Sequence, residues 1–226
     1  EHETLLKIAA ENKEEQLKRS KAEIVAHEAQ LKMLRYQLNP HFLFNTLNAI
    51  SALVQTKDAV RANTMIVQLS DFLRYSLDND PIQRVSLHEE LKALKLYLNI
   101  EQTRFGSRLE LEFDVTPAAE AVKIPSLILQ PLVENAIKYA IAPMEQGGKI
   151  TVLARVDGAF LELEMIDSGS ETILPDPKMP SPGVGLRNTI DRLHTFYGDD
   201  YSFRLENTDN KGTRVYMRLP LEKQVI

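Results

Sequence analysis

A histidine lies directly after a proline in residues 38–45, and an asparagine follows that histidine four residues later. Residues four apart share one face of a helix, so Asn45 is expected to lie over His41. Pro40 lacks a backbone N–H and disturbs the turn before it, which favours an imidazole exposed at a kink. A neutral imidazole can act as a nucleophile through one ring nitrogen when a partner holds the other. A helical histidine is usually structural, so this pattern indicates chemistry only beside a second motif.

Residues 129–139 carry that second motif, a helical apolar stripe with three polar residues outside it. The stripe has the i, i+3, i+4 spacing of a buried helix face and comprises Leu129, Leu132, Val133, Ala136 and Ile137. Glu134, Asn135 and Lys138 fall off the stripe. Asn135 and Lys138 are three apart on one face, which offers an oxygen ligand for a cation beside a positive charge for phosphate. A magnesium–nucleotide site needs both groups, whereas the plainer interpretation is a solvated face of a core helix.

Two glycine-containing segments favour the nucleotide interpretation. Residues 161–167 alternate as a strand that ends at Asp167, and Gly169 follows two residues later. A carboxylate at a strand end offers acceptor oxygens to a base amino group, and a glycine lets backbone approach a ligand closely. Gly183 and Gly185 stand at the start of an amphipathic helix, where backbone N–H groups and the helix dipole attract anions.

The order of these motifs resembles the ATP-binding domain of histidine kinases and their relatives, the GHKL superfamily with the Bergerat fold. Residues 134–138 are similar to the N box, 167–169 to the first half of the G1 box, 183–186 to the G2 box and 212–213 to the closing GT element. With the hexapeptide PHFLFN at 40–45, the chain resembles the LytS/YehU branch of sensor histidine kinases. The resemblance runs from about residue 31 to residue 220.

This resemblance implies roles for particular residues. His41 would be the phosphoacceptor, with Asn45 orienting its ring, and Asn135 would be the magnesium ligand. Lys138 would contact phosphate, and Asp167 would read the adenine amino group. The other positions implied to bind nucleotide are Tyr139, Gly169, Gly183, Gly185, Leu186 and Thr213. The implied cofactors are ATP and Mg2+, and the implied activity is that of an ATP-dependent protein-histidine kinase.

Three features depart from the pattern of the family. Glu171 stands where the G1 box usually has a second glycine, and its side chain restricts the backbone while its charge repels phosphate. Tyr139 and Ala140 replace the commoner His-Gly pair. Phe42 follows the histidine where many histidine kinases have an acid. The general base stays unassigned, because Asn45 can orient the ring but cannot take its proton.

The composition favours a cytoplasmic protein of one or two domains. The 226 residues are 43% hydrophobic and 26% charged, with a formal net charge of -5 and no cysteine. Cysteine absence excludes disulfides and thiolate metal sites, and scattered Lys and Arg argue against a nucleic-acid partner. No run of ~18 apolar residues is present, so we expect no membrane contact within this chain. The chain begins at Glu1 without a Met or signal peptide, and we therefore expect a longer protein with a sensor domain upstream.

Residues 1–38 are expected to form a signalling coiled coil, and a solvated single helix is the alternative. Apolar residues recur there every seven positions, at Ala10, Leu17, Ile24, Leu31 and Leu38, while Lys and Glu fill most other positions. Residues 39–80 are expected to form an antiparallel helical hairpin with a turn at Lys57-Asp58. Such a hairpin exposes apolar surface, so we expect a homodimer in which two hairpins form a four-helix bundle with one His41 from each.

Residues 81–226 are expected to form the ATP-binding α/β sandwich, which makes the whole chain α+β. Ser86 is predicted to cap a helix that runs to about Phe105. Further helices are predicted at 126–141 and 184–197, and strands at 108–115, 149–157, 160–167, 201–207 and 212–219. The proline-containing loop between 168 and 182 is expected to act as a lid.

The predicted function is that of a sensor histidine kinase output module in a two-component system. ATP would phosphorylate His41, and an aspartate in a response-regulator receiver domain would take the phosphoryl group next. One alternative, favoured by Glu171, is a degenerate kinase that serves as a dimeric signalling scaffold with weak or no nucleotide turnover. Another is an ATP-hydrolysing GHKL clamp, which the upstream histidine hairpin disfavours.

Overall fold

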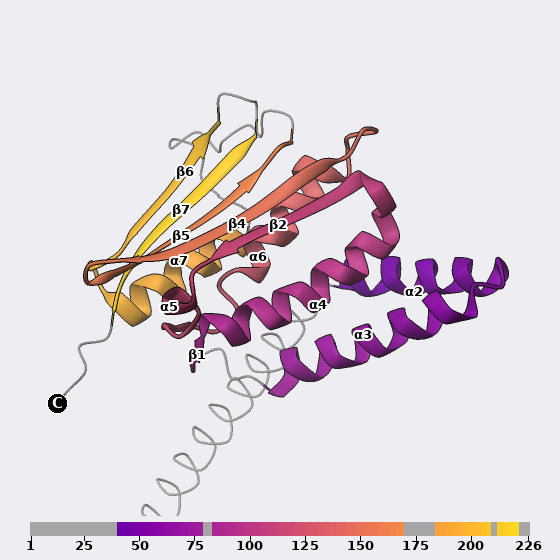
Figure 1. Ribbon diagram of the computed structural model, residues 1–226, viewed down its shortest axis with the longest axis horizontal. Helices are drawn as coiled ribbons and strands as arrows, with labels where there is room; N and C mark the ends of the chain where they lie inside the picture. The colour runs from indigo at the N-terminus through magenta and orange to yellow at the C-terminus, as the bar shows by residue number, and fades with distance from the viewer. Residues whose placement is uncertain (1–39, 79–82, 170–183, 209–211, 222–226) are drawn as a thin grey trace, which may run out of the picture. The chain divides into compact units, whose positions relative to one another are not determined.

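A computed structural model describes residues 40–78, 83–169, 184–208 and 212–221 (Figure 1). The coiled coil expected over 1–38 lies outside these ranges, as do most of the expected lid, Glu171 and Gly183. The chain divides into two compact units, residues 1–47 and 48–226.

Helix α2 spans Pro40–Gln55 and contains His41. The Thr46 hydroxyl donates a 2.8 Å hydrogen bond to the Phe42 carbonyl, and both side chains are buried. His41 and Asn45 therefore stand one helical turn apart, as predicted.

The turn after α2 is a Schellman motif centred on Lys57. The Lys57 N–H donates to the Val54 carbonyl at 3.0 Å, and the Asp58 N–H donates to the Leu53 carbonyl at 2.8 Å. Lys57 has a φ of 61°, in the left-handed region that favours glycine. Asp58 Oδ1 accepts a 3.2 Å bond from the Arg61 N–H and so caps the next helix. The predicted turn at Lys57-Asp58 is confirmed.

Helix α3, Ala59–Asp78, buries one apolar stripe and exposes another. The buried stripe recurs every three or four residues and comprises Ala62, Met65, Leu69 and Phe72. The ring of Phe72 packs against Tyr97 of helix α4 (Leu87–Phe105), with centroids 5.7 Å apart. Val60 and Ile66 of the same helix are 78% and 48% exposed. A single chain therefore leaves part of the apolar surface of α3 uncovered.

Helix α4 follows strand β1 (Arg84–Ser86) and begins with a capping box. The Glu89 N–H donates to Ser86 Oγ at 3.2 Å, and the Glu89 carboxylate accepts from the Ser86 N–H at 2.9 Å. The helix ends before Gly106, whose φ of 61° suits glycine. Both predicted ends of this helix are confirmed.

A five-stranded sheet of order β2-β4-β5-β7-β6 lies within residues 48–226. Its strands are β2 (Leu109–Val115), β4 (Gly148–Asp157), β5 (Phe160–Asp167), β6 (Ser202–Asn207) and β7 (Thr213–Pro220). Strand β2 is parallel to β4, whereas the other neighbours are antiparallel. Alternate residues of β5 and β7 are buried, so one face of the sheet packs on the core. The strand predictions hold to within a residue at each end.

Helices α4, α6 and α7 cover the buried face of this sheet (Figure 1). Helix α6 spans Gln130–Asn135 and continues as the π-helix η2, Ala136–Ile141, and α7 spans Val184–Tyr197. Three short elements are missing from the sequence prediction: η1 (Gly106–Arg108), α5 (Pro117–Glu120) and β3 (Lys123–Pro125), which pairs with β1. Each is too short for hydrophobic periodicity to reveal. The layered α+β arrangement agrees with the predicted class.

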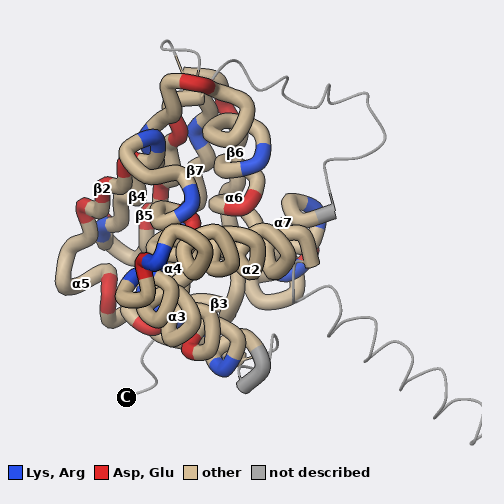
Figure 2. The backbone as a smooth tube through the Cα atoms, turned by 90° about the vertical axis from the view of Figure 1, so that its right-hand side faces the viewer, with Lys and Arg blue, Asp and Glu red and all other residues tan. Residues whose placement is uncertain are grey.

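The other face of the sheet carries paired charges. Arg214 on β7 donates two hydrogen bonds, of 2.9 and 2.7 Å, to Glu164 on β5. Lys149 on β4 lies 2.6 Å from Glu112 on β2. Figure 2 shows Lys and Arg interspersed with Asp and Glu along these strands.

Two kinds of feature are absent from the part of the chain that the structure describes. No helix there is long and apolar enough to cross a membrane. No group of three or more His, Cys, Asp or Glu side chains there is placed to hold a metal ion.

Candidate functional site

His41 is exposed on α2, and its ring contacts the side chain of Asn45. The Asn45 amide nitrogen lies 3.2 Å from His41 Nδ1 and 3.4 Å from Nε2. The amide can therefore hold the ring in one orientation, but it has no group that takes a proton. The contact predicted from the four-residue spacing is confirmed, and the imidazole is open to an incoming reactant.

Asp167 is the last residue of β5 and is buried. Its Oδ1 atom accepts hydrogen bonds from the Gly169 N–H at 3.1 Å and the Thr213 N–H at 3.2 Å. Burial raises the pKa of this carboxyl, and the two backbone hydrogen bonds oppose that rise. The second oxygen, Oδ2, accepts no hydrogen bond from a described residue. One oxygen thus fixes the carboxyl in place and the other keeps its acceptor capacity.

Thr213, at the start of β7, lies beside Asp167 because β5 and β7 are paired antiparallel. The Thr213 hydroxyl is buried and has no hydrogen-bond partner among the residues described. The preceding Gly212 comes so close to Asp167 that an added Cβ atom would lie 1.8 Å from the Asp167 carbonyl oxygen. This position therefore requires glycine, and the site holds a buried polar atom that lacks a partner.

Two more of the predicted glycines lie where the end of β5 and the start of α7 pack against neighbouring helices. A Cβ atom on Gly169 would lie 2.2 Å from the Ala140 Cβ in η2, so the end of β5 packs directly on that helix. A Cβ atom on Gly185 would lie 3.4 Å from the Pro131 Cβ and 3.9 Å from the Asn135 amide nitrogen. The first turn of α7 therefore packs beside α6. Leu186 is buried, and Gly183 lies outside the described residues.

Asn135 closes α6 at the point where the helix changes from α to π geometry. Its half-buried side chain makes no hydrogen bond to a described residue. Lys138 and Tyr139 are exposed on η2, with the Lys138 Nζ 4.7 Å from the Tyr139 ring centroid. The predicted common face of Asn135 and Lys138 assumes α-helical spacing, which the structure has only as far as Asn135. A π turn changes that spacing, and such turns are frequent at functional sites.

Two acidic residues, Glu134 of α6 and Glu101 of α4, lie close enough to interact electrostatically. Glu134 accepts a 2.8 Å hydrogen bond from the Gln130 amide, which holds it along its own helix. Glu101 is buried and pairs with Arg104 at 3.0 Å, so the predicted intrahelical ion pair is confirmed. Burial raises the pKa of Glu101 to about 7, Arg104 opposes the rise, and the charge of Glu134 adds to it.

Glu90 and Arg192 are residues that the sequence analysis missed. Glu90 lies in the first turn of α4 and is only 2% exposed. Its carboxylate accepts hydrogen bonds from the N–H groups of Leu127 and Leu129. A signal was present, because Glu90 falls on the apolar i, i+3, i+4 stripe of its helix, between Leu87 and Leu94.

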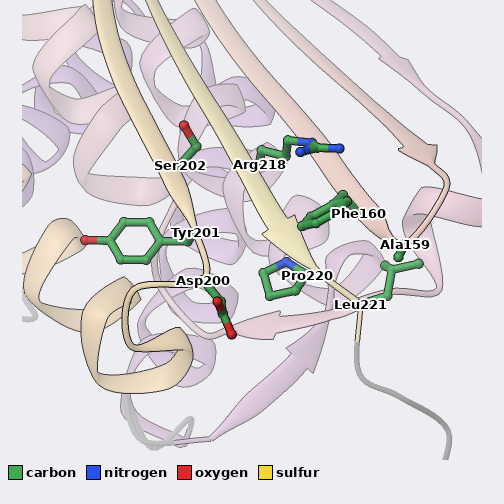
Figure 3. A pocket seen from close by; sticks show the side chains of 8 residues that line it. All are labelled: Ala159, Phe160, Asp200, Tyr201, Ser202, Arg218, Pro220 and Leu221. Atoms are coloured by element: carbon green, nitrogen blue, oxygen red, sulfur yellow. The ribbon is translucent and has the colours of Figure 1, made fainter.

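Figure 3 shows a surface hollow of about 500 Å³. It lies at the ends of β5 and β7 opposite to the ends that carry Asp167 and Thr213. It is lined by the start of β5, the start of β6 and the end of β7. The Arg218 guanidinium lies 3.7 Å from the Phe160 ring centroid there, and Tyr201 points away from both. None of the predicted site residues lines this hollow.

Comparison with known proteins assigns the class. The family model described as histidine kinase matches residues 29–109, which contain both α2 and α3. The histidine kinase domain of the blue-light activated histidine kinase EL346 from Erythrobacter litoralis is similar in structure, with a TM-score of 0.50 and 14% sequence identity. That likeness covers 86% of this chain and 95% of that domain, and it shows the fold alone. The fold is thus that of a histidine kinase domain.

Two curated relatives narrow the class to a family. The sensor protein LytS of Enterococcus faecalis is 32% identical over 208 residues, and the sensor histidine kinase BtsS of Escherichia coli is 35% identical over 205 residues. The matches cover 87% and 91% of this chain, respectively. The chain belongs to the LytS/BtsS family of sensor histidine kinases. It spans about 35% of the length of these two relatives.

Proposed function

We propose that this chain is the catalytic output region of a two-component sensor histidine kinase. ATP would bind to residues 81–226, and its γ-phosphoryl group would pass to His41 and then to a response-regulator aspartate. The observation that carries the proposal is the buried pair of Asp167 and Thr213 at the end of β5 and the start of β7. The Thr213 hydroxyl has no hydrogen-bond partner among the described residues, and the adjacent glycines pack closely around the pair. Asn135 and the exposed His41–Asn45 pair supply the other groups that phosphoryl transfer to histidine needs.

The adenine base would be recognised by Asp167 and Thr213. Because Oδ1 of Asp167 is held by two backbone N–H groups, Oδ2 would accept a hydrogen bond from the exocyclic amino group. The Thr213 hydroxyl would gain the partner that it lacks among the described residues. Gly169 and Gly212 would let the backbone on both sides of Asp167 pack closely, so that no side chain of theirs would occupy the space beside the carboxyl where a flat base would lie.

The phosphate groups would lie near the end of α6 and the start of α7. Asn135 would provide an amide oxygen to Mg2+, which usually keeps several waters and takes few protein ligands beside the nucleotide phosphates. The bound ion would neutralise phosphate charge. Lys138, Tyr139 and the backbone near Gly185 and Leu186 would bind the remaining nucleotide surface, with Gly183 completing the loop before α7.

The transfer of the phosphoryl group to His41 would need no catalytic base on the protein. The lone pair of one ring nitrogen would form the N–P bond while the bond from the γ-phosphorus to the bridging oxygen breaks, and ADP would leave with that electron pair. The proton on the other ring nitrogen would pass to solvent, because His41 is exposed. Asn45 would hold the ring for in-line attack, which fits a reaction that depends mainly on positioning and charge neutralisation.

The proposed partners follow from this reaction. A receiver domain would take the phosphoryl group, and a second copy of the chain would cover the exposed apolar surface of α3. A sensor domain earlier in the full-length protein would act through residues 1–38, and we place the reaction in the cytoplasm.

Labelled ATP tests the proposal directly. The purified chain would be incubated with γ-labelled ATP and Mg2+, together with the variants His41→Gln and Asn135→Ala. His88→Gln is the matched control, since His88 is also an exposed helical histidine. We expect acid-labile label on the wild type and on His88→Gln, none on His41→Gln, and little on Asn135→Ala.

Other outcomes point to the alternative functions. Absence of both label and ATP binding would favour a degenerate scaffold, and release of free phosphate without labelled protein would favour an ATP-hydrolysing clamp. Label that persists in His41→Gln would contradict the assigned phosphoacceptor.

A further inference from the structure

The turn that leads into α6 contains a leucine in a strained conformation. Leu127 has a φ of 57°, in the left-handed region that side chains other than glycine rarely adopt. The flanking residues Ser126 and Ile128 are fully buried. The sequence pattern predicts a helix from residue 126, and this turn delays its start to Gln130. Some part of the surrounding structure must hold the leucine in place.

Glu90 of α4 binds one side of this turn. Its Oε2 accepts from the Leu127 N–H at 2.9 Å, and its Oε1 accepts from the Leu129 N–H at 3.1 Å. Both oxygens therefore act as acceptors, as in an ionised carboxylate. Because Glu90 is only 2% exposed, water does not compete for these bonds.

Arg192 of α7 binds the carbonyl side of the same turn. Its Nη1 donates to the carbonyls of Ser126 and Leu127, the latter at 3.3 Å. The guanidinium and the Glu90 carboxylate also attract each other electrostatically. Two helices far apart in the sequence thus supply opposite charges to the N–H and carbonyl groups of one short turn.

The turn sets the position of α6. Glu90 holds the N–H of Leu129. The carbonyl of Leu129 accepts hydrogen bonds from the N–H groups of Leu132 and Val133, each at 3.1 Å. These are the first bonds of the helix that ends at Asn135. A six-residue helix is rigid over its length, so a shift of Leu129 would be carried to Asn135.

We propose that Glu90 and Arg192 are positioning residues that hold Leu127 in its left-handed conformation and thereby place Asn135 for nucleotide binding. The inference rests on the proposed function, since it is ATP that Asn135 would meet. The plainer interpretation is a polar pair that only stabilises the fold. The two interpretations differ at Leu127, because glycine adopts this conformation without strain and needs no clamp to hold it.

The test measures ATP affinity by calorimetry on the full chain with Mg2+, together with thermal unfolding. Glu90→Gln replaces one acceptor with an amide donor, and we expect ATP to bind at least about tenfold more weakly to the folded variant. Adding Leu127→Gly should restore most of this loss, whereas Leu127→Ala in the same background should not, because alanine keeps the Cβ constraint. Glu110→Gln, an exposed acid on β2, is the matched control and should leave the affinity unchanged.

A second pair of variants covers the case in which Glu90→Gln does not fold. Arg192→Lys keeps the charge but loses the planar guanidinium, and it should also weaken ATP binding. Arg155→Lys, an exposed arginine on β4, should not. Unchanged ATP affinity in folded Glu90→Gln and Arg192→Lys, or equal rescue by Leu127→Gly and Leu127→Ala, would overturn the clamp while the proposed function stands. A wild-type chain that binds no ATP would instead overturn the proposed function.

Discussion

Thr213 and Asp167 lie side by side, yet their polar atoms are used differently. Asp167 Oδ1 accepts two backbone hydrogen bonds, whereas the buried hydroxyl of Thr213 has no partner among the described residues. A buried polar group without a partner costs ~1–3 kcal/mol. A threonine that weakens the free protein but completes a hydrogen bond in the bound state is expected at a binding site rather than in a structural core.

We therefore expect Thr213→Val to separate stability from binding. Valine has nearly the same shape and no hydroxyl, so the free energy of unfolding should stay the same or rise by up to about 1 kcal/mol. ATP affinity should fall, because the hydrogen bond to the nucleotide is lost. Urea unfolding and calorimetry measure the two effects.

Thr189→Val is the matched control, since Thr189 is also buried but its hydroxyl donates a 3.3 Å bond to the Gly185 carbonyl. This variant should lose about 1 kcal/mol of stability. Equal stability losses in both variants would show that the Thr213 hydroxyl is satisfied in the free protein.

At the scale of elements, α4 and α6 meet where both carry acids. Glu101 of α4 is buried with Arg104, and the charge of Glu134 on α6 helps to raise the pKa of Glu101 to about 7. The unfolded chain has no such environment, so the folded state binds a proton more tightly at this position. Proton binding at Glu101, which follows mainly from its burial, is therefore linked to folding.

We expect this linkage to appear as a pH-dependent stability. Because the pKa of Glu101 is raised from 4.5 to about 7 on folding, its stabilising contribution is complete below pH 4.5 and is lost as the pH rises through about 7. The loss amounts to at most about 3 kcal/mol. Urea unfolding at several pH values between 4.5 and 8 measures it.

The Glu101→Gln variant isolates this group, since glutamine stays neutral at every pH. Its free energy of unfolding should fall less than that of the wild type as the pH rises. Glu110→Gln, an exposed acid, should follow the wild type. Parallel curves for wild type and Glu101→Gln would show that Glu101 ionises normally in the folded protein.

At the scale of the whole molecule, the helices α2 and α3 leave apolar side chains in water. Val54 is 60% exposed, Val60 78%, Ile66 48% and Val67 51%. Single exposed apolar residues are ordinary, but several along one helix are typical of an interaction surface. A second copy of the chain would cover them in the proposed four-helix bundle.

We expect the double variant Ile66→Glu/Val67→Glu to be monomeric at concentrations at which the wild type is a dimer. The two carboxylates would have to lose their water on association, which costs more than the apolar contact contributes. Sedimentation velocity at several concentrations measures the change. Ala118→Glu, an exposed position on α5 away from this helix, should remain dimeric. A monomeric wild type would contradict the proposed assembly.

Local features of this protein were predicted well because neighbouring residues are enough to produce them. The four-residue spacing of His41 and Asn45 and the capping box at Ser86 need only a single helical turn. The strand ends followed from alternating residues in β5 and β7. The motif order placed Asp167 and Thr213 in one expected site through family resemblance, although no periodicity relates residues that far apart.

Two features could not be read from the chain because residues distant in sequence create them. The contact between Asp167 and Thr213 requires β5 to pair with β7, and strand order is set by packing of the whole sheet. The late start of α6 coincides with the hydrogen bonds that Glu90, from a distant helix, accepts from the N–H groups of Leu127 and Leu129. Local pattern thus predicted which helices and strands form, while long-range hydrogen bonds and burial set where α6 begins and which polar atoms remain available to a ligand.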